Sequence, residues 1–204
     1  ESTVPDWRSH VADLPEHRGV LDIVLNVASF HHRKAGAFEV IRLGRETDLR
    51  SARERKVAVE LFLAGAILLM GIYHLGLFAS RREEIAPLHF GLFCLLLSVY
   101  VLLEGERYLC DLTSWSTWGL QRKVSNLSSF LAVPVFIAFI RTLFPEEVPK
   151  RVARTLSVAI VLLALGVLVT PALVYSRLIP VYELLVLFTC ATVLLALARA
   201  TLRG

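Results

Sequence analysis

Five titratable residues stand within or at the ends of long apolar runs, where an unpaired charge is costly: His74, Glu104, Glu106, Arg107 and Glu183. In a membrane segment, such side chains are candidates for proton transfer, for ligand contact or for polar coupling between helices. The sequence contains no HExxH, nucleophile elbow or phosphate-binding loop. These residues therefore indicate coupling within a bundle, and we expect no catalytic residue, no cofactor and no metal site.

His74 and Glu183 each have a plainer alternative reading. His74 lies one to two helical turns before Arg81, so it can sit at the membrane interface. Glu183 lies about one turn into an apolar run and follows Arg177. We expect its carboxylate to face the bundle interior, to pair with Arg177 or to reach the lipid headgroups.

Glu104, Glu106 and Arg107 form a charged group at the end of one apolar run. Glu104 and Arg107 are three residues apart, which places them on one face of a helix and allows an ion pair. The group is either an interfacial cap or a contact between the bundle and the domain that precedes it.

Residues 57–204 read as an all-α transmembrane helix bundle. The apolar runs predict spans at about 57–79, 88–109, 124–144, 155–175 and 178–198. Each is near the roughly 20 residues that a helix needs to cross about 30 Å of hydrocarbon. Helices are expected because a backbone in lipid must satisfy its own hydrogen bonds. No span contains a GxxxG pairing motif.

Residues 1–46 are rich in charge, and alternating apolar residues predict strands at 20–30 and 38–43. Two strands cannot bury a core, so this part is expected to be the C-terminal end of a β-rich domain. His31 and His32 are adjacent and diverge on a strand, which favours a polar turn over a metal site. Residues 47–56 predict a charged helical stalk.

Net charge is +4 and hydrophobic residues make up 55% of the 204 residues. The cations gather at the ends of apolar runs, where they face lipid headgroups, and no basic stripe predicts nucleic acid as a partner. The three cysteines predict neither a disulfide framework nor a metal site. The chain begins with Glu1 and ends without a closing pattern, so we expect a window from a longer polypeptide.

Three stretches carry a family resemblance: residues 27–36 (VASFHHRKAG), residues 52–56 (ARERK) leading to 71–78 (GIYHLGLF), and residues 87–96 (PLHFGLFCLL) followed by 105–107 (GER). They resemble the bacterial seven-transmembrane receptors with diverse intracellular signalling modules. The likeness covers most of residues 27–145, and beyond it only the hydrophobicity continues.

The resemblance implies a jelly-roll-like extracellular or periplasmic sensory domain, seven helices and a cytoplasmic output module. The chain would then be a receptor region in the bacterial inner membrane that senses a small-molecule or carbohydrate ligand. By analogy it can work as a homodimer. We count five spans and no output module, so this chain is expected not to be an enzyme, although a cyclase, kinase or phosphatase can follow it.

Two other classes stay open. A transporter or channel would carry internal repeats or buried midplane charges, and a membrane-embedded enzyme would need paired polar groups deep in the bundle. Orientation is also open. Loop cations favour an outside N-terminus, but the basic stalk nearly balances the count.

Overall fold

The computed structural model describes residue 14, residues 42–104 and residues 118–203, and within these ranges the only regular structure is helical. Five helices are long and apolar enough to cross a membrane, which confirms the predicted number of spans. The predicted β-rich part, with His31 and His32, lies outside the described residues. So do Glu106 and Arg107.

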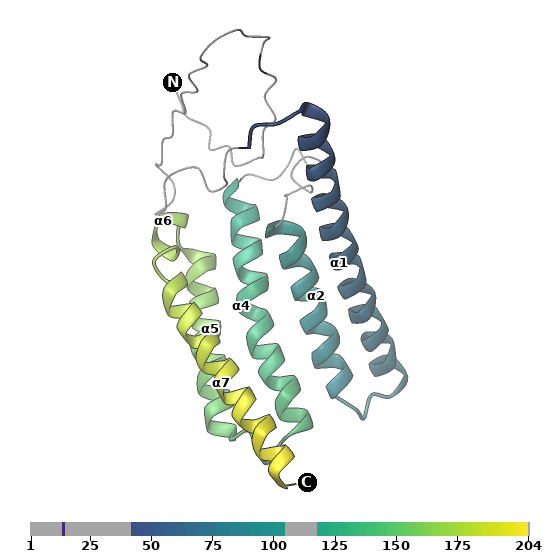
Figure 1. Cartoon of the computed structure of the whole chain (residues 1–204). Coiled ribbons are helices and arrows are strands. Elements are labelled where there is room, and N and C mark those ends of the chain that lie inside the picture. The colour runs from purple at the N-terminus through teal and green to yellow at the C-terminus, as the bar shows by residue number, and fades with distance from the viewer. Residues whose placement is uncertain (1–13, 15–41, 105–117, 204) are drawn as a thin grey trace.

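The five long helices run up and down, and each packs against the next one along the chain. They are α1 (Glu46–Ser80), α2 (Ala86–Glu104), α4 (Trp118–Leu143), α5 (Lys150–Val169) and α7 (Ile179–Arg203), with a single turn, α6 (Ala172–Tyr175), between the last two. We call the end that holds α6 the upper end, as in Figure 1, and the other the lower end. The central helix is α4, which contacts α2, α5 and α7.

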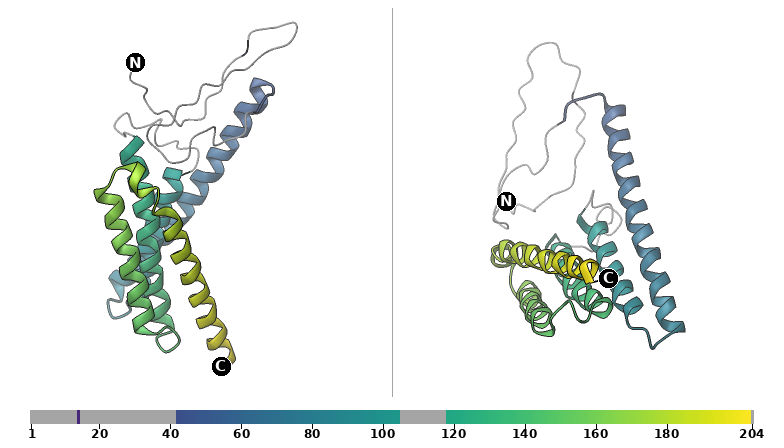
Figure 2. Two further views of the ribbon diagram at one scale, coloured as in Figure 1. Left: turned by 90° about the vertical axis from the view of Figure 1, so that its left-hand side faces the viewer. Right: turned by 60° about the horizontal axis from the view of Figure 1, so that its bottom comes forward.

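Helix α1 is a single unbroken element of 35 residues. At 1.5 Å per residue it is about 50 Å long, well beyond the roughly 30 Å of a bilayer core. The segment predicted as a stalk, residues 47–56, forms the first turns of this helix, and the side chains of Arg50 and Glu46 pair there at 2.7 Å. Both figures show this part of α1 extending past the upper ends of α2 and α4 (Figures 1 and 2).

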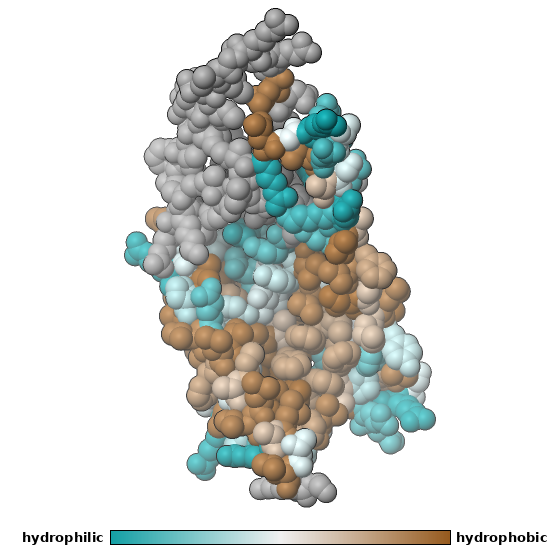
Figure 3. Space-filling model, viewed as in Figure 1, coloured by the Kyte–Doolittle hydropathy of each residue, from teal (hydrophilic) through white to brown (hydrophobic). Residues whose placement is uncertain are grey.

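Most of the apolar side chains lie on the outside of the bundle. Figure 3 shows a hydrophobic band around the middle of the molecule, with hydrophilic residues above and below it. Large residues such as Phe62, Leu162 and Leu187 are at least 60% exposed. Such a surface would favour aggregation in water, but it is the expected lipid-facing surface of a helix bundle in a membrane.

Small residues bring α1 and α2 into close contact. An added Cβ on Gly91 would lie 3.0 Å from the carbonyl oxygen of Gly71, and the hydroxyl of Ser98 donates to the carbonyl of Ala64 at 3.0 Å. Ala64 and Gly71 are seven residues apart, two turns along one face of α1. A search for GxxxG within single spans does not find this contact, because its small residues lie on two different helices.

Two apolar clusters hold α4, α5 and α7 together. The upper one is built on Phe130, Ile160, Val167 and Tyr175. The lower one includes Ile137 and Leu156 of α4 and α5 together with Ala196 of α7. Pro134 lies inside α4, which nevertheless continues as one helix to Leu143. In Figure 2, α7 diverges from its neighbours toward the lower end.

Candidate functional site

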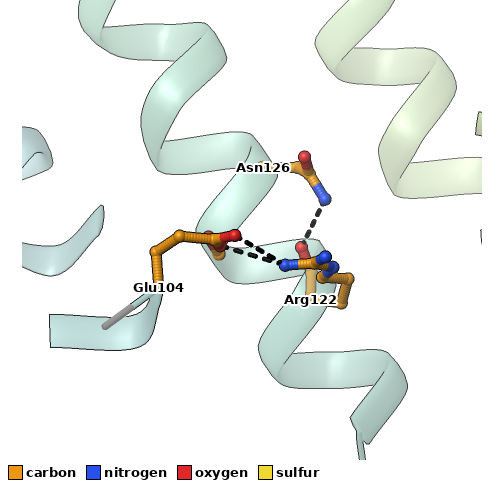
Figure 4. A network of polar contacts seen from close by, with 4 residues as sticks. Glu104, Arg122 and Asn126 are labelled. Atoms are coloured by element: carbon orange, nitrogen blue, oxygen red, sulfur yellow. Dashed lines mark hydrogen bonds and ion pairs between the residues drawn. The ribbon is translucent and has the colours of Figure 1, made fainter. Parts of the chain in front are cut away.

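A charged pair joins α2 to α4 at the upper end of the bundle. Nη1 of Arg122 lies 2.9 Å from Oε1 and 3.0 Å from Oε2 of Glu104, and Ser125 donates its hydroxyl proton to Oε2 at 2.8 Å (Figure 4). The side chains of Arg122 and Glu104 are 26% and 37% exposed. The pair is therefore partly withdrawn from solvent, where an ion pair is stronger than on an open surface.

Burial explains why each charge needs the other. Both side chains are more than half shielded from solvent, and a partly buried charge without a partner is unfavourable. The direct contact between the carboxylate and the guanidinium offsets that penalty for both groups.

Helix α4 also reaches α5 at this end. The ammonium of Lys123 donates to the carbonyl oxygen of Leu168 at 3.0 Å. Leu168 lies in the last turn of α5, where unpaired carbonyls favour a cation. Asn126 donates its amide to the carbonyl of Arg122 at 2.8 Å and supports the turn that carries both cations (Figure 4).

One turn lower, α7 is attached to α4 through an aromatic and polar contact. The hydroxyl of Tyr182 lies 2.9 Å from that of Ser129 and donates to the Ser129 carbonyl at 3.0 Å. Its ring stacks on Phe130 with centroids 3.8 Å apart. The upper half of α4 thus contacts α2, α5 and α7 through polar groups.

Two buried polar side chains near this network lack partners. The amide of Gln121 and the hydroxyl of Tyr175 are buried and make no hydrogen bond to any described residue. Burial raises the pKa of the Tyr175 phenol, and the nearby Arg122 opposes part of that shift, so the phenol is neutral at physiological pH. We call Glu104, Arg122, Ser125, Gln121 and Tyr175 the upper polar cluster.

The structure brings only one of the residues predicted from sequence into this cluster, namely Glu104. It places His74 toward the lower end, where Nδ1 is 2.8 Å from the carbonyl of Met70 and the ring meets Phe90 edge-on with centroids 4.6 Å apart. Glu183 lies exposed on α7 and forms no ion pair within the described chain, so the expected contacts with Arg177 or the bundle interior do not occur there.

Sequence reasoning missed the partner of Glu104. It offered Arg107, which lies outside the described residues, and treated Arg122 and Lys123 only as charges at a span boundary. A usable signal was present, since an acidic residue at the end of one span and a basic one at the start of the next meet at the same membrane face when the spans are antiparallel.

The sequence model described as 7TM diverse intracellular signalling matches residues 56–204. The chain belongs to that family. The searches of curated proteins and of solved structures gave no match.

The match to the 7TM diverse intracellular signalling family covers four of the five spans in full and α1 from residue 56 onward. The match includes every residue of the upper polar cluster. The chain is accordingly a multi-pass membrane protein of a signalling-receptor family. The resemblance drawn from residues 27–145 is confirmed for the membrane part.

Proposed function

We propose that this chain is the sensory and transmembrane region of a bacterial receptor. A ligand outside the cytoplasm biases the domain before α1, and the helix bundle relays the change to a cytoplasmic signalling module. The observation that carries the proposal is family membership, joined to a polar cluster at the end of the bundle where α1 extends past its neighbours.

Helix α1 suits the role of a mechanical link. It has no internal glycine before residue 65, so a push or rotation on its upper turns is transmitted into the membrane part without a hinge. Its tight contact with α2 through Gly71 and Gly91 would carry the movement to the helix that holds Glu104.

The upper polar cluster suits a two-state element. A ligand can shift the bundle only if it binds one of two arrangements more tightly. Buried polar groups without partners, such as Gln121 and Tyr175, are costly in the arrangement described here. A second arrangement that pairs them would be close in free energy, and a modest ligand preference would then suffice to populate it.

The cations of the loops, counted without the basic stalk that nearly balances them, favour a lower end that faces the cytoplasm. The loops there and the end of α7 carry Arg81, Arg82, Arg141, Lys150, Arg151, Arg154 and Arg199. An excess of cations in short loops is typical of the cytoplasmic side, and the N-terminus of α1 would lie on the opposite side.

The direct test is to read the native coding sequence beyond Gly204. The receptor proposal expects further spans and a soluble signalling domain, which would also identify the output chemistry. A second test separates receptor from transporter. The full-length protein in liposomes should show no substrate flux, and robust flux of ions or small solutes would overturn the proposal.

A further inference from the structure

A positively charged cavity lies at the lower end, between the C-terminal part of α4 and the first turns of α5. Its volume is about 320 Å³, and it is lined by Ile137, Ala138, Arg141, Lys150, Ala153, Arg154 and Ser157. This is within the roughly 300–1,000 Å³ range of small-molecule sites. Three of its lining residues are cations and none is acidic.

The three cations of the cavity, Arg141, Lys150 and Arg154, form no ion pair with another residue of the part of the chain that the structure describes. In addition, Nε of Arg141 is buried without a hydrogen bond. A buried guanidinium donor is costly to leave unpaired, so the cavity is short of an acceptor.

The backbone adds to the positive potential. Helix α5 begins at Lys150 after Pro149, and its first N–H groups have no partner within the helix. Twenty residues of aligned peptide dipoles place partial positive charge at that end. Glu146 and Glu147 lie in the preceding loop, but neither lines the cavity.

We infer that this cavity binds a phosphate group, and that the phosphate belongs to an anionic phospholipid. Arginine, lysine and a helix start are the groups that recognise phosphate oxygens. The cavity lies at the lower ends of α4 and α5, where the last turn of α4 carries Arg141 and the first residue of α5 is Lys150. Cations at the ends of membrane spans lie at the level of the lipid headgroups. Ile137, Ala138 and Ala153 add an apolar wall that suits the glycerol and upper acyl carbons of a lipid. The inference does not depend on the receptor assignment.

The test uses the purified full chain in nanodiscs of phosphatidylcholine with a minor share of phosphatidylglycerol, and native mass spectrometry counts the phosphatidylglycerol retained. One variant carries Arg141→Gln, Lys150→Gln and Arg154→Gln. The matched control carries Arg81→Gln, Arg82→Gln and Arg151→Gln, which removes equal charge at the same end but outside the cavity.

We expect the cavity variant to retain phosphatidylglycerol at least about tenfold more weakly than the control, since each cation near an anionic lipid is worth roughly a fivefold change in binding. Equal retention in the two variants would overturn the site. Inorganic phosphate distinguishes the source of the anion: if it displaces the lipid or stabilises the lipid-free protein equally well, the ligand is a free anion and the lipid assignment is wrong.

Loss of charge can also disturb folding, so a second variant leaves all three cations in place. Ala138→Phe fills the cavity from its wall. If Ala138→Phe retains as much phosphatidylglycerol as the wild-type chain, the inference is contradicted. If it retains less while its thermal unfolding is unchanged, the inference is supported.

Discussion

The contact between Glu104 and Arg122 shows how two partly buried charges on different helices stabilise an interface together. Their side chains are 37% and 26% exposed, so neither charge is fully hydrated. Removing one partner therefore leaves a partly buried charge without its counter-charge. Removing both leaves two neutral groups, which cost far less.

A double-mutant cycle with Glu104→Gln and Arg122→Gln measures this dependence. We expect the two single variants, added together, to lower the free energy of unfolding in detergent by more than the double variant does. The difference, which is the coupling energy of the pair, should be about 1–2 kcal/mol. The measurement is thermal or denaturant unfolding of the full chain followed by tryptophan fluorescence.

The pair Glu46–Arg50 is the matched control. It lies on one helix, and its side chains are 54% and 63% exposed against 37% and 26% for Glu104 and Arg122. Solvent screening should reduce its coupling to about 0.3–0.5 kcal/mol. Equal coupling in the two cycles would show that the upper pair is only a surface contact.

At this residue scale, sequence reasoning found Glu104 but not its partner. A charge beside an apolar run marks a residue that needs compensation, and that much can be read from one sequence. Which cation supplies it depends on how two spans pack, and Ser125, Gln121 and Tyr175 carry no charge that would single them out. Glu183 is the opposite case. It is an acidic residue about one turn into a predicted span, but its side chain is exposed on the surface of α7.

At the scale of helices, the approach of α1 to α2 rests on two glycines. A Cβ at position 91 would lie 2.9 Å from the Leu75 side chain and 3.0 Å from the Gly71 carbonyl. Leu75 can turn away, but a backbone carbonyl moves only if the helices separate. The interface therefore has no room for a methyl group at this position.

We expect Gly91→Ala to destabilise the bundle by about 1–2 kcal/mol, because overpacking costs about 1–3 kcal/mol and exceeds the roughly 0.5–1 kcal/mol that alanine adds to a helix. Gly76→Ala is the control, since no atom lies within 4 Å of its added Cβ. It should be neutral or slightly stabilising in the same unfolding assay. A stabilising Gly91→Ala would mean that the helices are not this close.

The upper turns of α1 yield a prediction about the link to the outer domain. Leu49→Gly with Ala52→Gly should weaken the helix by about 1–2 kcal/mol. Amide exchange in residues 46–56 should then rise roughly tenfold, while α4 and α5 are unchanged. In the full-length receptor, the response to ligand should be lost while basal output remains.

Leu43→Gly is the control for this pair, because Leu43 precedes the helix and is 76% exposed. It should change neither exchange nor response. An unchanged response in the double glycine variant, despite faster exchange, would show that α1 does not carry the signal.

The limits of a membrane span and the ends of a helix are different quantities. The second span was expected to reach residue 109, and residues 105–109 lie outside the described residues. The fifth span was expected at 178–198, and helix α7 runs from Ile179 to Arg203. Hydropathy locates the part of a helix that lies in lipid, whereas its ends are set by capping and loop contacts that hydropathy does not measure.

At the scale of the whole molecule, the number of spans followed from the sequence, because the hydrocarbon thickness fixes the length of each apolar run. The fewer contacts of α7 and the lower cavity could not be predicted. Both depend on how side chains from different helices fill the space between them.

Five spans place the two ends of the bundle on opposite sides of the membrane. The cations of the loops, counted without the basic stalk, predict that the lower end is cytoplasmic. Truncated chains ending at Glu84 or at Gly204 should yield fluorescent fusions with a green fluorescent protein, because both ends lie at the lower side. A chain ending at Arg177, in the loop before α7, should instead yield active alkaline phosphatase, which matures only outside the cytoplasm. Each of the three truncated chains is fused to both reporters in turn, so that the ratio of the two signals at one site does not depend on the expression level. The reverse pattern at all three sites would place the N-terminus of α1 in the cytoplasm, and the domain before it could then not sense a ligand outside the cell.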